Sequence, residues 1–349
     1  MSKKLFLDIH VIQTLPPSNI NRDDTGSPKT AQYGGVARAR VSSQSWKKAI
    51  RTHFNENGGL KNVGIRSLKI VEYVADEILK LDETKTIAEA LKLASATLTI
   101  AGLKPKDNKL KALFFMGATQ AEGLAKAAVA GVTDKKEVQA ILRANPAIDI
   151  ALFGRMVADD ASLNEDASSQ IAHAISTHAV QTEFDFFTAT DDLSAEDSTG
   201  AGMLGTVEFN SSTLYRYGNV AIHELSRQLD DSTAVLHASK LFIEAFINSM
   251  PTGKVNTFAN QTLPHAVIVT LRSDRPVNLV SAFESPVKAR DGFVDPSIIE
   301  LGNEFMRVGK FVEKPELTLT IGVSDLGSEQ DSLSALVETF AEELSDILQ

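Results

Sequence analysis

The chain has 349 residues, of which 43% are hydrophobic, and its formal net charge is −10. This size suits one elaborated domain or about two domains. The chain contains no cysteine, which excludes disulfides, cysteine-ligated zinc, iron–sulfur clusters and thiol catalysis. No apolar run approaches the ~20 residues that span a bilayer, and residues 1–13 lack the apolar stretch of a signal peptide, so we expect a cytoplasmic protein without a membrane partner.

Residues 5–12, LFLDIHVI, alternate in hydrophobicity and predict a strand that leads into a basic segment. Residues 1–60 carry a net charge of +5, whereas the rest of the chain carries −15. The positive charge gathers in residues 16–51, which are also rich in glycine and turn formers. Turns let backbone N–H groups approach phosphates while Lys and Arg neutralise them. We therefore expect an anion-binding surface here.

A helix should follow this segment, with Ser42 or Ser43 as its N-cap. At ~100° per residue, its apolar side is formed by Trp46, Ala49, Ile50 and Phe54. Its opposite side is formed by Gln44, Lys47, Lys48 and Arg51. An ordinary amphipathic helix with a solvated face gives the same pattern. Binding is favoured here because Gly34 and Gly35 permit close backbone approach and the charges meet at a helix N-terminus.

The rest of the chain shows two different sequence patterns, one on each side of about residue 181. Residues 67–180 are alanine-rich, and we expect helices there with no strand between them. After Thr182, strands are expected in EFDFFTAT, GMLGTVEFNS, HAVIVTLRS and LTLTIGV. Helices are expected at residues 220–249, 297–311 and 331–348. These elements predict an α+β core that is split by a long helical insert.

Several strings suggest other chemistry, and each has a plainer explanation. His173 and His178 would lie ~140° apart on a helix and could not chelate one ion. The string PTGKVNTF at 251–258 lacks the spacing of a phosphate-binding loop, so we expect a loop of the α+β core there, with an RNA or subunit contact as the open alternative. No G-x-S-x-G string occurs. Four adjacent Asp pairs, at 23–24, 159–160, 191–192 and 230–231, could suggest a two-metal nuclease. Only Asp23 and Asp24 stay open as a catalytic alternative, because they lie in the basic segment.

A series of longer motifs follows the basic segment in order. They are DIALFGRM (149–156), IAHAISTH (171–178), DFFTATDDL (185–193), LGTVEFNSSTLYRYGN (204–219), FANQTLP (258–264), AFE (282–284) and VKARDGFVDPS (287–297). With these motifs the sequence resembles the CasC family, the backbone subunit of the type I-E CRISPR surveillance complex Cascade. The resemblance covers most of the chain except residues 60–145.

The resemblance implies an α+β fold with a modified RRM-like, ferredoxin-like palm, a large helical fingers insertion and a protruding β-hairpin thumb. On this sequence the palm would comprise residues 1–60 and 211–349, the fingers residues 61–181 and the thumb residues 182–210. The resemblance also implies a non-catalytic subunit without metal or cofactor that polymerises along the CRISPR RNA guide. Its partners would be the guide, the target DNA strand through the guide, neighbouring copies, the guide 5′-end cap subunit, the guide 3′-end processing endonuclease, and the large and small subunits.

Carried onto this chain, the guide-binding candidates are Asn21, Arg22, Lys29, Arg38, Arg40, Ser42, Ser43, Gln44, Lys47, Lys48 and Arg51. The apolar candidates for displacing a guide base are Met156, Phe186, Phe187, Thr190 and Leu204. Val36 and Ala37 stand where some relatives are more basic, and positions 186 and 190 carry Phe and Thr where some relatives have Trp and Val. Two alternatives are a guide-bound, metal-dependent ribonuclease of the type III backbone kind, which would use the loop Asp, and a lone RRM-like protein that binds RNA generically.

Overall fold

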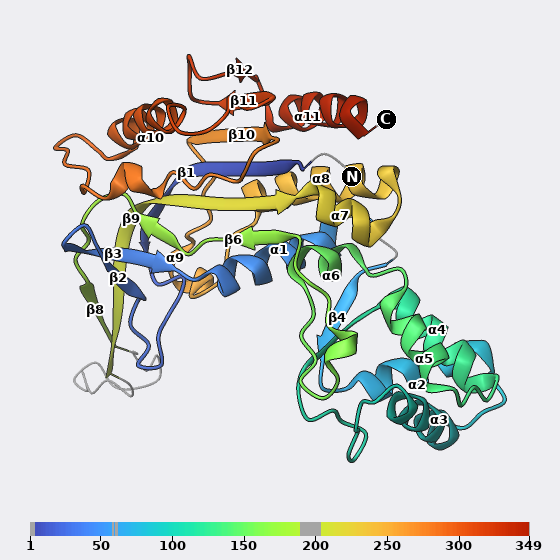
Figure 1. Cartoon of the computed structure of the whole chain (residues 1–349). Coiled ribbons are helices and arrows are strands. Elements are labelled where there is room, and N and C mark those ends of the chain that lie inside the picture. Colours follow the sequence, from blue (N-terminus) through green and yellow to red (C-terminus); the bar gives the residue numbers. More distant parts are fainter. Residues whose placement is uncertain (1–3, 58, 60–61, 189–203, 349) are drawn as a thin grey trace, which may run out of the picture.

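The computed structural model describes residues 4–57, 59, 62–188 and 204–348. The fold is α+β, as predicted, and a large sheet forms its centre (Figure 1). The main path through the sheet is β12-β11-β10-β1-β9-β7-β3-β2, and β6 and β8 also pair with β9. The strands are β1 (Phe6–Ser18), β2 (Thr30–Tyr33), β3 (Val36–Val41), β6 (Ser169–Ile171), β7 (Ala174–Ser176), β8 (Glu183–Thr188), β9 (Leu204–Ala221), β10 (Ala266–Arg272), β11 (Leu317–Ile321) and β12 (Ser328–Glu329).

The two faces of β1 have different environments because side chains alternate along a strand. Leu7, Ile9 and Val11 pack into the core beneath α1, α8 and α11. Ile12 belongs to a second core that includes residues of β9, β10 and α10. The sheet is therefore covered by helices on both faces. These helices are α1 (Ser43–Asn57), α7 (Ile222–Leu229), α8 (Ser232–Asn248), α9 (Val255–Phe258), α10 (Val294–Val308), α11 (Leu333–Leu348) and the 3₁₀ helix η2 (Val280–Phe283).

A separate helical lobe projects from the sheet, at the lower right of Figure 1. It has a hydrophobic core of its own, to which residues of α2, α3, α4 and α5 contribute. Its elements are β4 (Gly64–Ser67), α2 (Ile70–Leu81), α3 (Ile87–Ile100), β5 (Phe114–Gly117), α4 (Ala118–Val129), α5 (Lys135–Arg143) and η1 (Ala161–Leu163). Helix α6 (Ile148–Phe153) contributes to the main core and also contacts β4 and β5, so it joins the lobe to the sheet.

A hairpin of β8 and the first part of β9 projects on the other side, at the lower left of Figure 1. All six residues of β8 are exposed, because this part of the sheet has no covering layer. The strand β9 has 18 residues and continues from the hairpin into the centre of the sheet. Helix α1 lies between the hairpin and the helical lobe (Figure 1). None of the helices in the described ranges is both long and apolar enough to cross a membrane.

The prediction of uninterrupted helices over residues 67–180 is wrong at three places. Residues 114–117 form β5, and residues 169–171 and 174–176 form β6 and β7. Phe114, Phe115 and Met116 are all buried, so this run lacks the alternation that marks a strand. The strands β6 and β7 have three residues each and are stabilised by pairing with β9. Tertiary pairing therefore outweighs the local helical preference of these alanine-containing segments.

Candidate nucleic-acid interface

Two residues of the basic segment fix the start of α1. Ser42 is the N-cap, since its Oγ accepts a hydrogen bond from the Ser45 N–H at 3.4 Å. The side chain of Asn21 accepts from the Ser42 N–H at 2.8 Å, and its carbonyl oxygen accepts from the Lys29 N–H at 2.9 Å. Ser42 is buried. Asn21 and Ser42 therefore hold the preceding loop against the helix N-terminus, while Ser43 begins the helix.

The amphipathic division of α1 is confirmed. Its buried residues are Trp46, Ala49, Ile50 and Phe54. On the opposite side, Gln44 and Lys48 are exposed. The Lys47 ammonium lies 5.9 Å from the centre of the Phe153 ring, and partial burial lowers the pKa of Lys47. The cationic side of α1 is therefore the side that points away from the core.

This face lines an open groove between α1 and the helical lobe, which we call groove B. Groove B has a volume of about 860 Å³. The polar residues of α1 that line it are Gln44, Lys47, Lys48 and Arg51. Arg66 and Met156 also line it, and the Met156 side chain is 85% exposed. An open groove that combines cations with an exposed apolar side chain suits a nucleic-acid strand, which has a charged backbone and apolar base faces.

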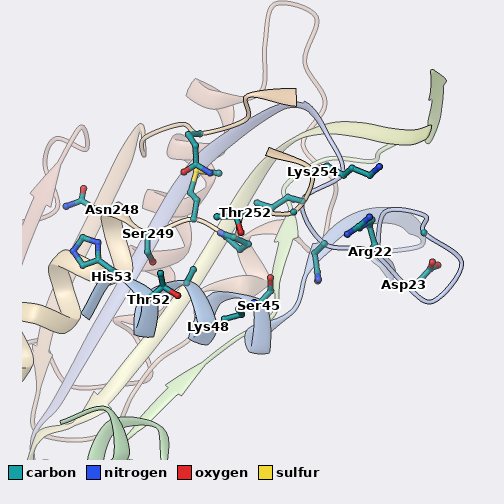
Figure 2. Close-up of a pocket in the computed structure, with 18 of the residues that line it drawn as sticks. Arg22, Asp23, Ser45, Lys48, Thr52, His53, Asn248, Ser249, Thr252 and Lys254 are labelled. Carbon is teal, nitrogen blue, oxygen red and sulfur yellow. The ribbon is translucent and has the colours of Figure 1, made fainter. Parts of the chain in front are cut away.

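A second open groove lies on the other side of α1, and we call it groove A. It has a volume of about 980 Å³ and lies between residues 20–26, α1 and residues 248–254. Arg22, Lys48 and Lys254 supply its cations (Figure 2). Lys254 is not among the guide-binding candidates that the sequence indicates, because the string PTGKVNTF lacks the spacing of a phosphate-binding loop. Lys48 lines both grooves, so the two grooves meet at α1.

A third group of cations lies at the sheet edge formed by β2 and β3. The Nη1 atom of Arg40 lies within hydrogen-bond distance, 3.1 Å, of Nδ1 of His173. The Nε of Arg40 donates to the Thr30 carbonyl oxygen at 3.1 Å. The pKa of His173 is lowered by burial and by the positive charges of Arg40 and Lys29. This edge therefore repels further cations and favours an anion beside it.

Arg38 has a different environment from the other candidates. Its side chain is completely buried, and it donates to the carbonyl oxygens of Ser176 at 3.0 Å and Phe283 at 2.8 Å. Its Nε donates to the Tyr33 carbonyl at 3.1 Å. The expectation that Arg38 contacts a guide is therefore corrected, because its donors hold β3 to β7 and η2. Charge alternation along the sequence could not indicate which of Arg38 and Arg40 is buried.

The hairpin carries a group of exposed apolar side chains. Phe186 and Leu204 are 65% and 64% exposed, and Phe187 is 40% exposed. Phe187 packs over Gly205, its partner on β9, where a Cβ atom would lie 2.3 Å from the ring. Thr190, the remaining hairpin candidate, lies outside the described residues. Exposed aromatic side chains on a projecting hairpin are suited to contact another molecule.

Comparison with known proteins identifies the family of the chain. The model of the CT1975-like protein family matches residues 7–347. The chain belongs to the CT1975-like protein family. The fold of this CT1975-like protein is similar to that of a chain from a "CRISPR RNA-guided surveillance complex, pre-nicking", with a TM-score of 0.86 and 32% identity over 97% of this chain and 100% of that chain.

A second solved structure is also similar to this chain over nearly its full length. A chain from a "CRISPR RNA-guided surveillance complex" matches this CT1975-like protein with a TM-score of 0.76 and 28% identity, over 97% of this chain and 99% of the other. A search of curated proteins found no match. These similarities extend over nearly the full length of both chains, so they include the sheet, the helical lobe and the hairpin.

In this CT1975-like protein, the Asp23 carboxylate has a structural role in its own turn. Its Oδ1 accepts hydrogen bonds from the N–H groups of Thr25 at 2.9 Å and Ser27 at 3.0 Å, and from the Thr25 hydroxyl at 2.7 Å. The hydrogen bond from the Thr25 hydroxyl is the main cause of the lowered pKa of Asp23. The carboxylate therefore stabilises the turn of the basic loop.

The two histidines of IAHAISTH do not lie on a helix, so the geometry that we expected for them is wrong. His173 lies between β6 and β7, and His178 follows β7. The His178 ring stacks on Phe293 at 3.7 Å, and its Nε2 accepts from the Thr213 N–H at 3.0 Å. Within the described ranges, no three His, Asp or Glu side chains are placed to hold a metal ion.

Proposed function

We propose that this chain is the guide-RNA-binding backbone subunit of a type I-E CRISPR surveillance complex, the CasC role in Cascade. One observation carries the proposal. The cations of α1 line open grooves, in a chain whose nearly full-length structural matches come from CRISPR RNA-guided surveillance complexes. Lysines on a helix face can neutralise phosphates, and such contacts do not distinguish one base from another. Such a surface accepts any guide and leaves sequence recognition to base pairing.

We assign the parts of the fold to this role as follows. The central sheet, with its covering helices, is the palm, the helical lobe is the fingers domain and the β8–β9 hairpin is the thumb. The guide contacts of the palm are then Arg22, Lys29, Arg40, Gln44, Lys47 and Lys48. Asn21, Ser42 and Ser43 shape the helix N-terminus on which this surface is built. Arg51 lines groove B and also joins α1 to the lobe.

Copies of the subunit would associate head to tail along the guide. A heterologous interface whose rotation does not close produces an open helical filament, and the guide length then limits its extent. The exposed residues Phe186 and Leu204 of one hairpin, with Met156 of the next copy, would displace a guide base between them. The remaining partners would be the target DNA strand and the cap, endonuclease, large and small subunits of the complex. A cytoplasmic location stays a prediction.

The role that we propose is non-catalytic. Cleavage of a phosphodiester by a loop carboxylate needs a metal ion or a positioned acid or base. Asp23 is instead engaged with its own turn. The function of the basic loop is then to hold Arg22 beside α1 in groove A.

Binding of labelled single-stranded RNA to purified Lys47→Ala and Lys48→Ala variants tests this function. Affinity should fall by a similar factor for unrelated RNA sequences, and the slope of log K against log salt should decrease by about 0.7 for each phosphate that the variant no longer neutralises. Lys310→Ala is the control, since Lys310 is exposed beyond the end of α10. Losses that depend on RNA sequence, or binding that does not respond to salt, would contradict recognition of the RNA backbone.

A further inference from the structure

The loop formed by residues 248–254 contains a buried hydroxyl without a partner. Ser249 is 6% exposed, and its Oγ makes no hydrogen bond within the described chain. Ser249 also lines groove A, beside Asn248 and opposite Thr52 of α1 (Figure 2). Buried polar atoms in native proteins nearly always have a partner, so an unpartnered hydroxyl on the wall of a groove points to a ligand that supplies one.

The backbone of this loop is held in a specific conformation. A Cβ atom at Gly253 would lie 2.1 Å from the carbonyl oxygen of Ile20, so only glycine permits this approach to the basic segment. Lys254, the next residue, has a φ of +52°, a left-handed conformation that is unfavourable for a side chain other than glycine. Strained residues persist where the surrounding structure holds them and are concentrated at binding sites. The close contact with Ile20 thus fixes the position of Lys254 on the groove wall.

The cations of groove A gather at one end of it. Figure 2 shows Arg22 and Lys254 near the end where α1 begins, whereas Asn248, Ser249 and His53 lie toward the other end. The helix N-terminus adds a partial positive charge at the cationic end. Asp23 and Asp24 line the same end, but the Asp23 carboxylate is engaged by its own turn and Asp24 is exposed to solvent. Lys254 forms no ion pair with any described residue, so its charge is available to a ligand.

We propose that the loop of residues 248–254 is a second RNA-binding element, separate in sequence from the basic segment. Lys254, together with Arg22 and Lys48, binds a phosphate at the cationic end of groove A. The Ser249 hydroxyl donates a hydrogen bond to an oxygen of the same strand deeper in the groove. This inference rests on the proposed function. It extends the RNA path from groove B across α1 into groove A, because Lys48 lines both grooves.

The test compares RNA binding by Lys254→Gln, Lys254→Arg and Ser249→Ala with that of the unchanged protein. Lys254→Gln should weaken binding of labelled single-stranded RNA about threefold to tenfold and lower the salt slope by about 0.7, whereas Lys254→Arg should preserve both. Ser249→Ala should weaken binding about threefold without lowering the thermal unfolding midpoint, because its hydroxyl has no protein partner to lose.

The outcomes separate this inference from the proposed function. If Lys47→Ala and Lys48→Ala weaken RNA binding while Lys254→Gln and Ser249→Ala do not, the loop has no RNA contact and the proposed function stands. If none of the four variants weakens binding, both ideas fail. If Lys254→Gln retains RNA affinity but reduces self-association of RNA-free protein in sedimentation, groove A contacts a second copy of the chain and the RNA assignment is overturned.

Discussion

The guanidinium of Arg51 lies with its Nε 3.4 Å from Oδ2 of the Asp149 carboxylate and joins α1 to α6. The same guanidinium donates to the Gly64 carbonyl at 3.2 Å and lies 4.2 Å from the centre of the Phe115 ring. Asp149 is buried, and burial raises its pKa, whereas the charge of Arg51 opposes this shift. One arginine of the cationic helix therefore also sets how the helical lobe meets the sheet.

Arg51→Ala should lower the free energy of unfolding by about 2 kcal/mol, because the buried Asp149 carboxylate loses its charged partner. Urea unfolding measures this loss. Lys48→Ala is the matched control on the same helix and should change the free energy of unfolding by less than about 0.5 kcal/mol, because Lys48 is exposed. Equal free energies of unfolding for the two variants would show that the Arg51–Asp149 contact does not stabilise the junction between α1 and α6.

Gly34→Ala should be far more destabilising than Gly35→Ala, although both glycines have positive φ values, of +60° and +77°. A Cβ atom at Gly34 would lie 1.6 Å from the Glu284 carbonyl oxygen, whereas no atom lies within 4 Å of one at Gly35. We expect a loss of about 3 kcal/mol or more at position 34 and about 1 kcal/mol at position 35. Thermal unfolding of the two variants provides the comparison, and similar losses would contradict close packing of β2 and β3 against residue 284.

Two neighbouring groups of β1 should give opposite pH dependences of stability. Burial raises the pKa of Asp8 to about 7 and lowers that of His10 to about 3. Between about pH 4 and 6.5 the folded state retains the Asp8 proton that the unfolded state loses, so the Asp8 contribution falls as pH rises. The unfolded state binds the His10 proton that the folded state excludes, so the His10 contribution rises with pH.

Asp8→Asn should therefore leave the His10 dependence unopposed. The free energy of unfolding of the variant minus that of the unchanged protein should therefore rise as the pH increases from about 4 to 6.5. The rise should be at most about 1.4 kcal/mol per pH unit, which corresponds to one proton. The Arg272 guanidinium and the Tyr217 hydroxyl contact Asp8 and are retained in the variant. Parallel stability profiles for variant and unchanged protein from pH 4 to 7 would argue against a protonated Asp8.

Phe186→Ser should weaken assembly of several copies on RNA without changing the stability of the subunit. Phe186 is 65% exposed on the hairpin, so the folded chain loses little by its removal. Phe311→Ser is the matched control, since Phe311 is 77% exposed beyond α10. Electron microscopy or sedimentation of protein–RNA mixtures would measure the assembly. Normal multi-copy assemblies with Phe186→Ser would remove Phe186 from the proposed contact between copies.

Asp23→Ala should weaken RNA binding rather than abolish a cleavage reaction. The Asp23 carboxylate accepts three hydrogen bonds within its turn, and loss of these bonds should loosen the loop that carries Arg22. A guide-loaded assembly of the unchanged chain, incubated with matched RNA and Mg²⁺ or Mn²⁺, should leave that RNA intact on a denaturing gel. Asp24→Ala provides the adjacent control. Metal-dependent cuts that disappear with Asp23→Ala would establish a ribonuclease instead.

The local sequence was sufficient to locate the helices and strands in which buried and exposed residues alternate with the period of a helix or a strand. The apolar side of α1 and the strands β1, β8, β10 and β11 lie where the sequence predicted them, to within a few residues at most boundaries except the end of β1. The α+β class and the split of the core by an inserted lobe also followed from the order of patterns. The helix expected at residues 220–249 is two helices, α7 and α8, because Asp230 adopts a left-handed conformation between them.

Only the tertiary structure decided which charged residues face solvent. Arg38 and Arg40 are equivalent in the sequence pattern, yet the first is buried among carbonyl oxygens of residues 176 and 283 and the second is partly exposed at a sheet edge. Arg155 and Met156 are adjacent, yet the arginine is buried in the lobe and the methionine is 85% exposed. The cationic end of groove A likewise combines residues 22, 48 and 254. Burial depends on contacts between segments far apart in the chain, so a local pattern gives the type of a side chain but not the partner that it meets.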